Sequence, residues 1–365
     1  MGALRLRFGK LERLSAARPG ATEWQVAIEG EGQGHAIAYD GLTDRLEPGD
    51  GVLLNTTAAA LGLGTGGLHF IVSRLACPSP VDRFAGREAG HLLKLRYTPL
   101  QHRVLAVEDE ASPHRAAMLS FQSLEGIPVV CAELHSQMAA AAIAVHAGGF
   151  GLRLVYVMTD SAALPAGLSR LAAALREQGL LSAVVTAGQA FGGDYEAVNL
   201  YSALIAARTI GGADVILVGQ GPGNAGTGTQ YGFSGLALLE ALHAAAALGG
   251  QPLLVARVSE AETRARHRGL SHHTATLARL VRCPVEIPLP AGADVAVREA
   301  VAAVDPEGRH ATPGVDAAAA MPALARFRPP LTSMGRSVEE ERSFFLAAAA
   351  AGVRAAELVQ RLAST

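Results

Sequence analysis

Between about residues 126 and 287, short apolar segments alternate with helical ones, and this rhythm constrains the fold more than any other feature of the chain. The apolar segments are residues 128–132, 152–158, 182–186, 213–218, 252–258 and 284–287, and the helical stretches are 136–146, 167–178, 194–209, 234–248 and 272–281. Nearly continuous hydrophobic runs are typical of strands that have helices on both faces of their sheet. Strand–helix alternation joins parallel strands through right-handed crossovers. The sequence therefore predicts a three-layer α/β domain with a mostly parallel sheet.

The first third of the chain shows no such alternation. Short strand-type segments recur there at residues 4–8, 24–29, 35–39, 51–55, 69–75, 92–97 and 103–107, separated by turns rich in glycine and proline. Several short strands at close spacing are typical of a small barrel or a sandwich. We therefore expect an all-β domain, of barrel or sandwich type, ahead of the α/β domain.

The last seventy residues differ again. A loop rich in glycine, proline and charge covers residues 305–315, and a final helical stretch begins near Ser337, whose spacing from Glu340 is that of a capping box. We expect three parts in all: a β-rich domain over residues 1–115, an α/β domain over 116–295, and a C-terminal helical extension over 296–365 that packs on the α/β domain.

Composition narrows the classes of function. Half of the residues are hydrophobic and the net charge is −2, so the chain buries a large interior and offers no basic patch for nucleic acid. The three cysteines, Cys77, Cys131 and Cys283, are an odd and sparse set without a CxxC pair, which argues against a disulfide framework and a cysteine-based zinc site. We expect Cys131 and Cys283 to be buried, inert thiols.

Location and assembly are expected from the same composition. No apolar run is long enough to span a membrane, and the N-terminus alternates like a strand rather than a signal peptide. We expect a soluble, cytoplasmic protein that binds neither nucleic acid nor membranes. A homo-oligomer is expected, as a symmetric dimer, because that is the commonest soluble assembly.

Polar side chains collect directly after the predicted strands of the α/β domain. In open α/β sheets, ligands bind outside the carboxyl ends of the strands. Five successive strands are followed by small, hydrogen-bonding or titratable residues, which is more than plain turns require. Among them, the candidates for acid–base catalysis are Glu133, His135, Asp160 and Asp194. We predict that this rim is the functional face.

The sharpest feature of the rim is a glycine-rich loop, Gly-Gln-Gly-Pro-Gly-Asn-Ala-Gly-Thr-Gly-Thr, at residues 219–229. Glycines let backbone amides converge on an anion, and the following helix N-terminus adds partial positive charge. We therefore predict a phosphate- or carboxylate-bearing ligand. The predicted ligand-binding residues are Gly219, Gln220, Gly221, Gly223, Asn224, Thr227, Gly228 and Thr229. The alternative is a loop that is rich in glycine only for tight packing.

Two nucleotide-binding motifs are excluded. Gly221-x-Gly223-x-x-Gly226 formally matches the dinucleotide fingerprint, but its helix begins too late and it lies in the fourth strand–helix unit rather than the first. The same pattern recurs at residues 62–67, inside the predicted β domain. No lysine follows the glycines, as a phosphate-binding P-loop requires. The sequence therefore identifies no cofactor.

Histidines and arginines follow the fifth strand. His272 and His273, with His267 nearby, are predicted to bind ligand or transfer protons, and the alternative is that they only begin a helix capped by Ser271. A metal site with Glu133, His135, Asp160 or Asp194 is a further alternative, although no HExxH or HxH pattern is present, and the metal stays unassigned. The arginines either clamp an anionic substrate or lie in a solvated loop; they are Arg257, Arg264, Arg266 and Arg268.

Several stretches together resemble an uncharacterised bacterial family that is catalogued as domain of unknown function 3866. They are Gly51-Val-Leu-Leu-Asn-Thr-Thr with Leu61-Gly-Leu-Gly-Thr-Gly-Gly, Gly90-His-Leu-Leu-Lys-Leu-Arg-Tyr-Thr-Pro, Gly188-Gln-Ala-Phe-Gly-Gly-Asp-Tyr-Glu-Ala-Val-Asn, and residues 219–235. The resemblance covers nearly the whole chain. It implies that the chain is one unit and supplies no catalytic residues.

We interpret the rim as the site of an enzyme that acts on a small anionic metabolite. The alternatives are a non-catalytic metabolite-binding or regulatory protein, and a scaffold in which the glycine-rich loop is purely structural. Titratable residues that converge within hydrogen-bond reach of a closed pocket would favour the enzyme.

Overall fold

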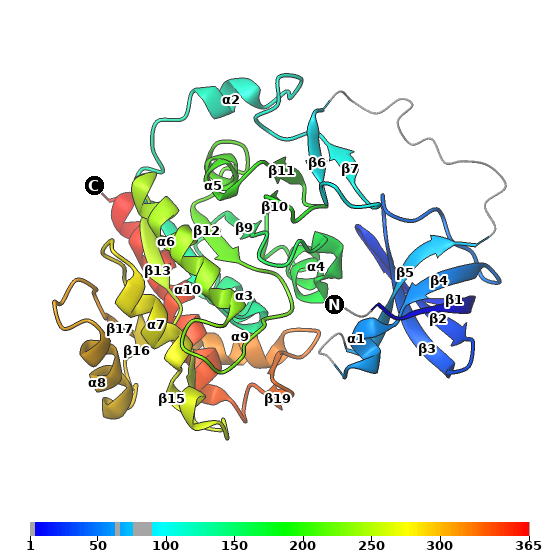
Figure 1. Ribbon diagram of the computed structural model, residues 1–365. Coiled ribbons are helices and arrows are strands. Elements are labelled where there is room, and N and C mark those ends of the chain that lie inside the picture. Colours follow the sequence, from blue (N-terminus) through cyan, green and yellow to red (C-terminus); the bar gives the residue numbers. More distant parts are fainter. Residues whose placement is uncertain (1–3, 63–65, 76–89, 365) are drawn as a thin grey trace. The chain divides into compact units, whose positions relative to one another are not determined.

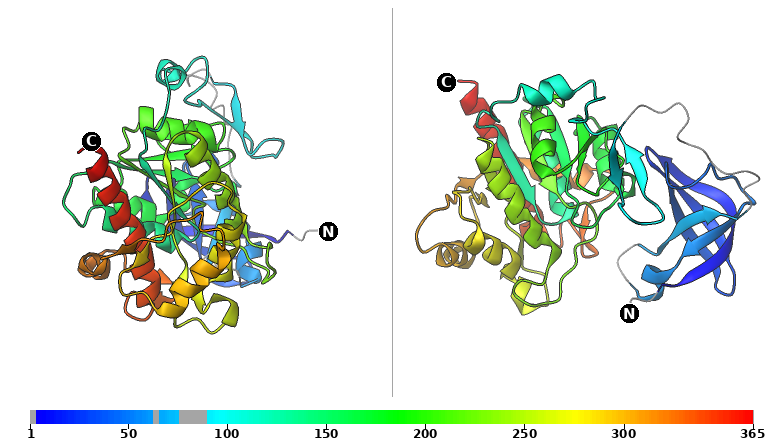
Figure 2. Two further views of the ribbon diagram at one scale, coloured as in Figure 1. Left: turned by 90° about the vertical axis from the view of Figure 1, so that its left-hand side faces the viewer. Right: turned by 45° about the horizontal axis from the view of Figure 1, so that its top comes forward.

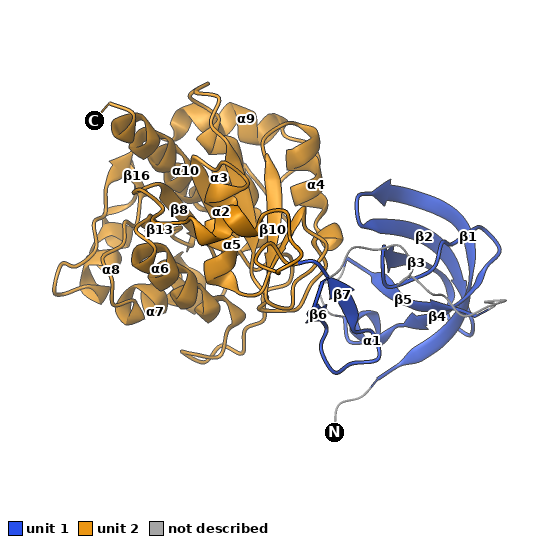
Figure 3. Ribbon diagram, turned by 90° about the horizontal axis from the view of Figure 1, so that it is seen from above, with its two compact units in different colours: residues 1–105 blue, residues 106–365 orange. Residues whose placement is uncertain are grey.

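The computed structural model describes residues 4–62, 66–75 and 90–364. It divides into two compact units, unit 1 over residues 1–105 and unit 2 over residues 106–365, which Figure 3 shows in different colours. An all-β unit comes first and an α/β unit follows, as the sequence predicts. Cys77 and part of the predicted turn at residues 62–67 lie outside the described residues. None of the helices in the described part of the chain has the length and apolarity of a membrane-spanning segment.

Unit 1 is a closed barrel, which decides between the two architectures expected for it. Its strands follow the order β1 (Leu6–Arg18), β2 (Ala21–Ile28), β3 (Gly32–Tyr39), β5 (Leu68–Arg74), β4 (Gly51–Asn55), and β4 pairs back with β1. Only β3 and β5 are parallel neighbours. Alternate residues, including Trp24, Val26 and Leu54, fill the interior. The short helix α1 (Thr57–Ala60) follows β4, and β6 (Leu92–Lys94) and β7 (His102–Val104) form a separate hairpin.

The predicted first strand, residues 4–8, proves too short. Strand β1 continues to Arg18, although its second half reads as mixed polar and apolar sequence. Two register irregularities, between Leu11 and Arg13 and between Leu14 and Ala16, shift which side chains face the interior. Such bulges break the two-residue alternation on which the prediction depended.

Unit 2 is built on a six-stranded parallel sheet with the order β11-β10-β9-β12-β8-β13 (Figure 1). The strands are β8 (Pro128–Ala132), β9 (Leu154–Met158), β10 (Ala183–Ala187), β11 (Tyr195–Ala197), β12 (Val215–Gly219) and β13 (Gln251–Leu254). Helices α3 (His135–Val145), α4 (Arg170–Glu177), α9 (Met321–Arg326) and α10 (Arg342–Leu362) pack in one core. Helices α5 (Leu200–Thr209), α6 (Leu238–Ala247), α7 (His272–Leu280) and α8 (Val295–Val304) pack in the other. Figure 2 shows helices on both faces of this sheet.

The remaining elements of unit 2 are short. Helix α2 (Arg115–Leu119) precedes β8. Three strand pairs form outside the main sheet: β14 (Val258–Ser259) with β15 (Gly269–Leu270), β16 (Leu289–Pro290) with β17 (Gly314–Val315), and β18 (Thr332–Ser333) with β19 (Arg336–Ser337). Single 3₁₀ turns lie at Ala166–Leu168, Ser234–Ala237, Ala265–His267 and Ala318–Ala320.

The structure corrects the predictions at the two edges of the main sheet. The predicted helix over 194–209 begins only at Leu200, because Tyr195–Ala197 adds an edge strand to the sheet. Gly193 permits this return, since an added Cβ there would lie 2.8 Å from the Val184 carbonyl oxygen. The predicted strand over 284–287 makes only isolated bridges, from Glu286 to Leu253 and Ala311.

The strand order places a divergence point in the middle of the sheet. Strand β8 leads into α3 on one face, and its neighbour β12 leads into α6 on the other. The two segments that follow β8 and β12 therefore diverge at the carboxyl ends of these strands. A crevice at such a point is where open α/β sheets bind their ligands.

Helices α3 and α10 meet at a position that excludes any side chain. An added Cβ at Gly352 would lie 2.2 Å from the Ala141 carbonyl oxygen and 2.9 Å from the Ala144 Cβ. Gly352→Ala is therefore expected to lower the free energy of unfolding by about 1–3 kcal/mol through overpacking. This loss exceeds the ~1 kcal/mol that alanine gains over glycine inside a helix. Urea unfolding measures the change.

The matched control is Gly292→Ala, because an added Cβ at Gly292 meets nothing within 4 Å. Its free energy of unfolding is expected to stay within about 0.5 kcal/mol of wild type. A Gly352→Ala protein as stable as this control would contradict the close helix contact.

Candidate functional site

One buried carboxylate, that of Glu133, lies at the divergence point. Glu133 follows β8 directly and is 1% exposed. Its Oε1 accepts hydrogen bonds from Asn224 Nδ2 at 2.6 Å, from Arg257 Nη1 at 3.4 Å and from His273 Nδ1. These donors come from the glycine-rich loop, the segment after β13 and the start of α7. A single oxygen atom thus joins three elements that are far apart in the sequence.

The other oxygen of this carboxylate is in the opposite situation. Glu133 Oε2 is buried and has no hydrogen-bond partner among the described residues. Gln220 Oε1, whose amide nitrogen donates to the Glu133 carbonyl oxygen at 3.2 Å, is also buried without a partner there. An unsatisfied buried acceptor costs about 1–3 kcal/mol. Such atoms are rare in folded proteins, and a site that accumulates them is a candidate for binding a ligand that supplies the missing donors.

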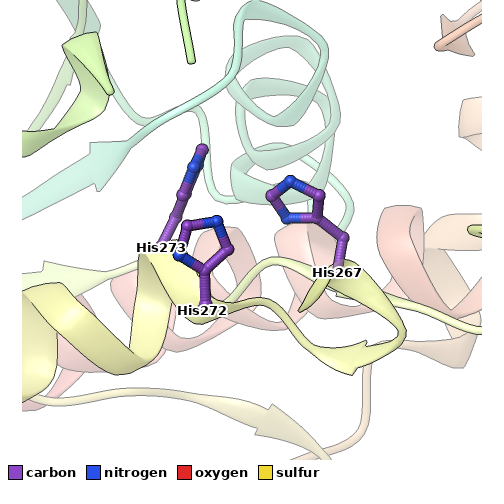
Figure 4. Close-up of side chains that lie close together, drawn as sticks. All are labelled: His267, His272 and His273. Carbon is purple, nitrogen blue, oxygen red and sulfur yellow. The ribbon is translucent and has the colours of Figure 1, made fainter. Parts of the chain in front are cut away.

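Three histidines stand beside this carboxylate. His272 and His273 begin α7 with Ser271 as its cap, which is the position that the alternative interpretation of these residues gives them, and His267 lies in the turn before the helix. Ring centroids are 4.3–4.9 Å apart, and one potential ligand atom from each ring lies within 4.8 Å of the others. Figure 4 shows the three side chains extending toward one another. The Phe233 ring stacks on the His273 ring with centroids 3.8 Å apart, and Glu133 hydrogen-bonds to Nδ1 of the same ring.

Burial decides the charge of two of these histidines. Desolvation, aided by the nearby Arg257 guanidinium, lowers the pKa of His267 to about 3. Burial, followed by the charges of His273 and Arg266, also lowers the pKa of His272. Both rings are therefore neutral at pH 7 and offer lone pairs instead of positive charge. The Nε2 atom of His272 is buried and, within the described ranges, hydrogen-bonds to nothing.

The glycine-rich loop folds as a hairpin next to His273. Thr227 N donates to the Gly232 carbonyl oxygen at 2.8 Å, and the Thr227 and Thr229 hydroxyls lie 2.9 Å apart. Gly232 has no room for a Cβ, which would lie 2.2 Å from Thr227 Oγ1. Gly223 has a φ of 99°, in the left-handed region that favours glycine. Part of the glycine and threonine content therefore serves the hairpin itself.

The two ends of the loop have different surroundings. At its start, Gly221 N donates to the Tyr156 hydroxyl at 3.0 Å, and Asn224 reaches down to Glu133. At its tip, the position of a Cβ on Gly228 lies 3.4 Å from the Arg266 guanidinium carbon. The loop is thus anchored in the buried cluster, and its exposed tip lies against an arginine.

The remaining acid–base candidates have other partners. His135 Nε2 lies 2.6 Å from Ser169 Oγ, and burial lowers the pKa of His135 to about 4. Asp160 lines a cavity of about 100 Å³ with Asn199 and Glu240. Asp194 accepts hydrogen bonds from Arg176 at 2.5 Å and from the Val184 backbone at 2.7 Å. The structure therefore groups only Glu133, of the four candidates, with Asn224, His272 and His273.

Sequence reasoning missed two residues of this site. The Tyr156 hydroxyl donates to the Gly219 carbonyl oxygen at 3.3 Å and so fixes the start of the loop together with its bond to Gly221. Phe233 supports His273. A tyrosine inside an otherwise aliphatic strand was the available signal for the first. Nothing in the sequence distinguishes Phe233 from an ordinary core residue.

An ion-pair network holds the segment that carries His267. Glu262 accepts hydrogen bonds from Arg264 Nε at 3.0 Å and Nη2 at 2.6 Å, and lies 3.7 Å from Arg336 Nη2. These bonds, Arg264 foremost, lower the pKa of Glu262 to about 2. Ser259 Oγ donates to the buried Glu341 carboxylate at 2.9 Å. The turn before α7 is therefore fixed to β19 and the start of α10.

This network predicts a dependence of stability on pH. Because the pKa of Glu262 is lower in the folded protein than its ordinary value of 4.5, the ionised carboxylate stabilises the fold above about pH 4.5. The stabilisation is lost as the pH falls toward about 2. The difference in free energy of unfolding between wild type and Glu262→Gln should therefore be largest near neutral pH and shrink in acid. Urea unfolding over a pH series measures it.

The control is Glu339→Gln, an exposed carboxylate that forms no ion pair with any residue the structure describes. Its stability should follow the wild-type pH profile. A Glu262→Gln difference that is constant across the series would contradict the assigned role of the network.

Comparison with known proteins identifies a family and no activity. A family model with the description "protein of unknown function (DUF3866)" matches residues 35–352. No curated protein and no solved structure matches the chain.

Proposed function

Because the chain belongs to the family described as protein of unknown function (DUF3866), we propose a function from the site alone: an enzyme that binds a small anionic metabolite and transfers a proton through Glu133. The main support for this proposal is that the two oxygens of the Glu133 carboxylate have different surroundings. Three donors hold Oε1, while the buried Oε2 has no partner among the described residues. A general base needs a fixed orientation and a free lone pair, and Glu133 offers both.

The surroundings support proton transfer over a purely structural role. The half-buried carboxylate of Glu286, by contrast, has both oxygens hydrogen-bonded, through Arg354 and Gln251, as is usual for a structural role. Glu133 instead keeps one oxygen for a substrate or a water molecule. The neutral His272 ring packs against the Glu133-bonded His273 ring, with centroids 4.3 Å apart, and has an unpartnered nitrogen among the described residues. It can accept or relay a proton.

Positive groups near the loop support an anionic substrate. Arg266 is exposed beside Gly228 and forms no ion pair with any described residue. The backbone amides of Gly223 and Gly228 donate to no group in the described chain. Free amides together with a free guanidinium suit a phosphate or a carboxylate.

The decisive variant is Glu133→Gln, which keeps the shape of the side chain and removes the basic oxygen. A panel of phosphorylated and carboxylated metabolites is first screened for an increase in Tm, and the compounds that bind are then followed for turnover by NMR. We expect Glu133→Gln to retain the Tm shift and to lower turnover by roughly 10²–10⁴-fold, the usual contribution of a general base.

The matched control is Glu286→Gln, which disrupts the ion pair with Arg354. It is expected to lower the free energy of unfolding, while the metabolites that bind are converted at the wild-type rate. Metabolites that bind to wild type but are not converted would refute the enzyme and support the alternative, a metabolite-binding protein. The absence of any Tm shift across the panel would refute both.

Arg266→Ala tests the anionic character of the ligand. Loss of a charge-assisted hydrogen bond costs about 1.5–3 kcal/mol, so the Kd of a bound phosphate or carboxylate should rise about 10- to 100-fold. The dependence of Kd on salt should also weaken, because one fewer charge is screened. Isothermal titration at two salt concentrations measures both.

Arg279→Ala is the control, since this exposed arginine of α7 forms no ion pair within the described part of the chain. It should leave the Kd unchanged. An equal effect of the two variants would show that only the overall charge of the protein matters.

A further inference from the structure

The three histidines beside Glu133 form a set whose nitrogens converge. His267, His272 and His273 each contribute one potential ligand atom to a group that lies within 4.8 Å, and His267 and His273 are buried. The rings pack against one another with centroids 4.3–4.9 Å apart, and each ring has two polar nitrogens to satisfy. One group shared by the three rings can satisfy the nitrogens that the chain leaves over.

In two of the three rings, a hydrogen bond at Nδ1 leaves Nε2 as the nitrogen that can bind a ligand. His273 Nδ1 bonds to Glu133 Oε1, and His267 Nδ1 lies 2.8 Å from Ser271 Oγ. Ser271 Oγ also accepts from the His273 backbone amide at 3.2 Å, and an oxygen with two lone pairs can accept from both. With Nδ1 protonated in each ring, the Nε2 lone pair is free. The structure thus presents two oriented Nε2 lone pairs, which can accept a hydrogen bond or bind a metal ion.

The third ring lacks a partner altogether at one nitrogen. His272 Nε2 is buried and meets no hydrogen-bonding atom of the described residues. His135 and His310 also leave a buried Nδ1 without a described partner, but each hydrogen-bonds through Nε2, to Ser169 Oγ at 2.6 Å and to the Ala278 carbonyl oxygen at 2.9 Å. His272 hydrogen-bonds to described residues through neither nitrogen. The unsatisfied nitrogen points to a group that the protein chain itself does not supply.

We propose that His267, His272 and His273 bind one divalent transition-metal ion, for which Zn²⁺ is the test. Imidazole nitrogens suit Zn²⁺, Co²⁺, Ni²⁺ and Cu²⁺, whereas Mg²⁺ and Ca²⁺ prefer oxygen ligands. Three protein ligands leave a fourth position for water or substrate, the arrangement of catalytic zinc sites. The proposal goes beyond the proton transfer assigned to Glu133 and does not require it, because metal binding is measured without any metabolite.

The distances permit coordination with a small adjustment. Ligands of a tetrahedral Zn²⁺ at ~2.0–2.1 Å lie roughly 3.3 Å from one another. The observed atoms lie within 4.8 Å, so the rings must close by about 1.5 Å at most. His272 is half-buried and its Nε2 has no hydrogen bond to a described residue, so its rotation breaks no such bond at that atom.

Charge near the histidines is balanced by Glu133. Arg257 Nη1 lies 3.2 Å from His273 Nδ1, and the N-terminus of α7 is also positive, so both oppose a cation. The Glu133 carboxylate pairs with Arg257 and at the same time accepts from His273 Nδ1. A carboxylate that bonds the far nitrogen of a metal-binding histidine orients the ring and makes it more basic. Glu133 would therefore be a positioning residue for the metal.

The experiment is Zn²⁺ titration of the untagged full chain after chelator treatment, by calorimetry, with Co²⁺ absorption spectra as a second readout. We expect one metal per chain, bound with a Kd below about 1 μM, and a Co²⁺ spectrum of tetrahedral type. His272→Ala should lose this binding. Glu133→Gln should weaken it by roughly 10- to 100-fold, the usual effect of removing such a second partner.

His35→Ala is the matched control, because His35 is exposed on β3 of unit 1, and it should bind Zn²⁺ as wild type does. Circular dichroism and Tm verify folding, and His267→Ala replaces His272→Ala if the latter does not fold. No binding at one equivalent, or binding that survives in the folded histidine variant, would overturn the metal site. Repeating the metabolite screen in the presence of chelator separates the metal site from the proposed function. If the metabolites still raise the Tm and the protein binds no Zn²⁺, the metal site is wrong and the proposed function stands.

Discussion

The arrangement of the segments at the carboxyl ends of the sheet strands depends on the burial of one carboxylate, that of Glu133. An ionised carboxylate taken out of water is costly unless it is paired and hydrogen-bonded. Here the pairing comes from Asn224, Arg257 and His273, which lie on three separate elements. Removing one partner of such a buried pair typically costs about 3–5 kcal/mol, because it leaves a charge uncompensated. The carboxylate thus holds the glycine-rich loop, the end of β13 and the start of α7 together.

The strand order explains why Glu133 can do this. The segments that follow the neighbouring strands β8 and β12 run to opposite faces of the sheet, and such a divergence point is where open α/β sheets bind their ligands. Glu133 and Gln220 are the first residues beyond these two ends. Helix α7 brings its N-terminal histidines to the same place, held there by Ser271 and by the ion pairs around Glu262. The strand order and the capped start of α7 therefore bring the polar side chains of the site together.

Much of this was predictable, because hydrophobic runs, turns and strand ends are local properties. The β unit, the parallel sheet and the polar rim follow from them, and so do Glu133, Asn224 and the Ser271 cap as members of that rim. Side-chain direction is not local: His135 lies two residues from Glu133 but turns to Ser169, and Asp194 pairs with Arg176. The edge strand Tyr195–Ala197 and the bulges of β1 depend on pairing with distant chain, which no window of sequence contains.

A double-mutant cycle between Glu133→Gln and Asn224→Ala tests most directly whether this carboxylate organises the site. Unfolding free energies of the two single variants and the double variant give the coupling between the end of β8 and the loop. Residues in one hydrogen-bond network couple by about 0.5–3 kcal/mol, and the account predicts a value in that range. Single effects that simply add, with no coupling beyond about 0.3 kcal/mol, would contradict it.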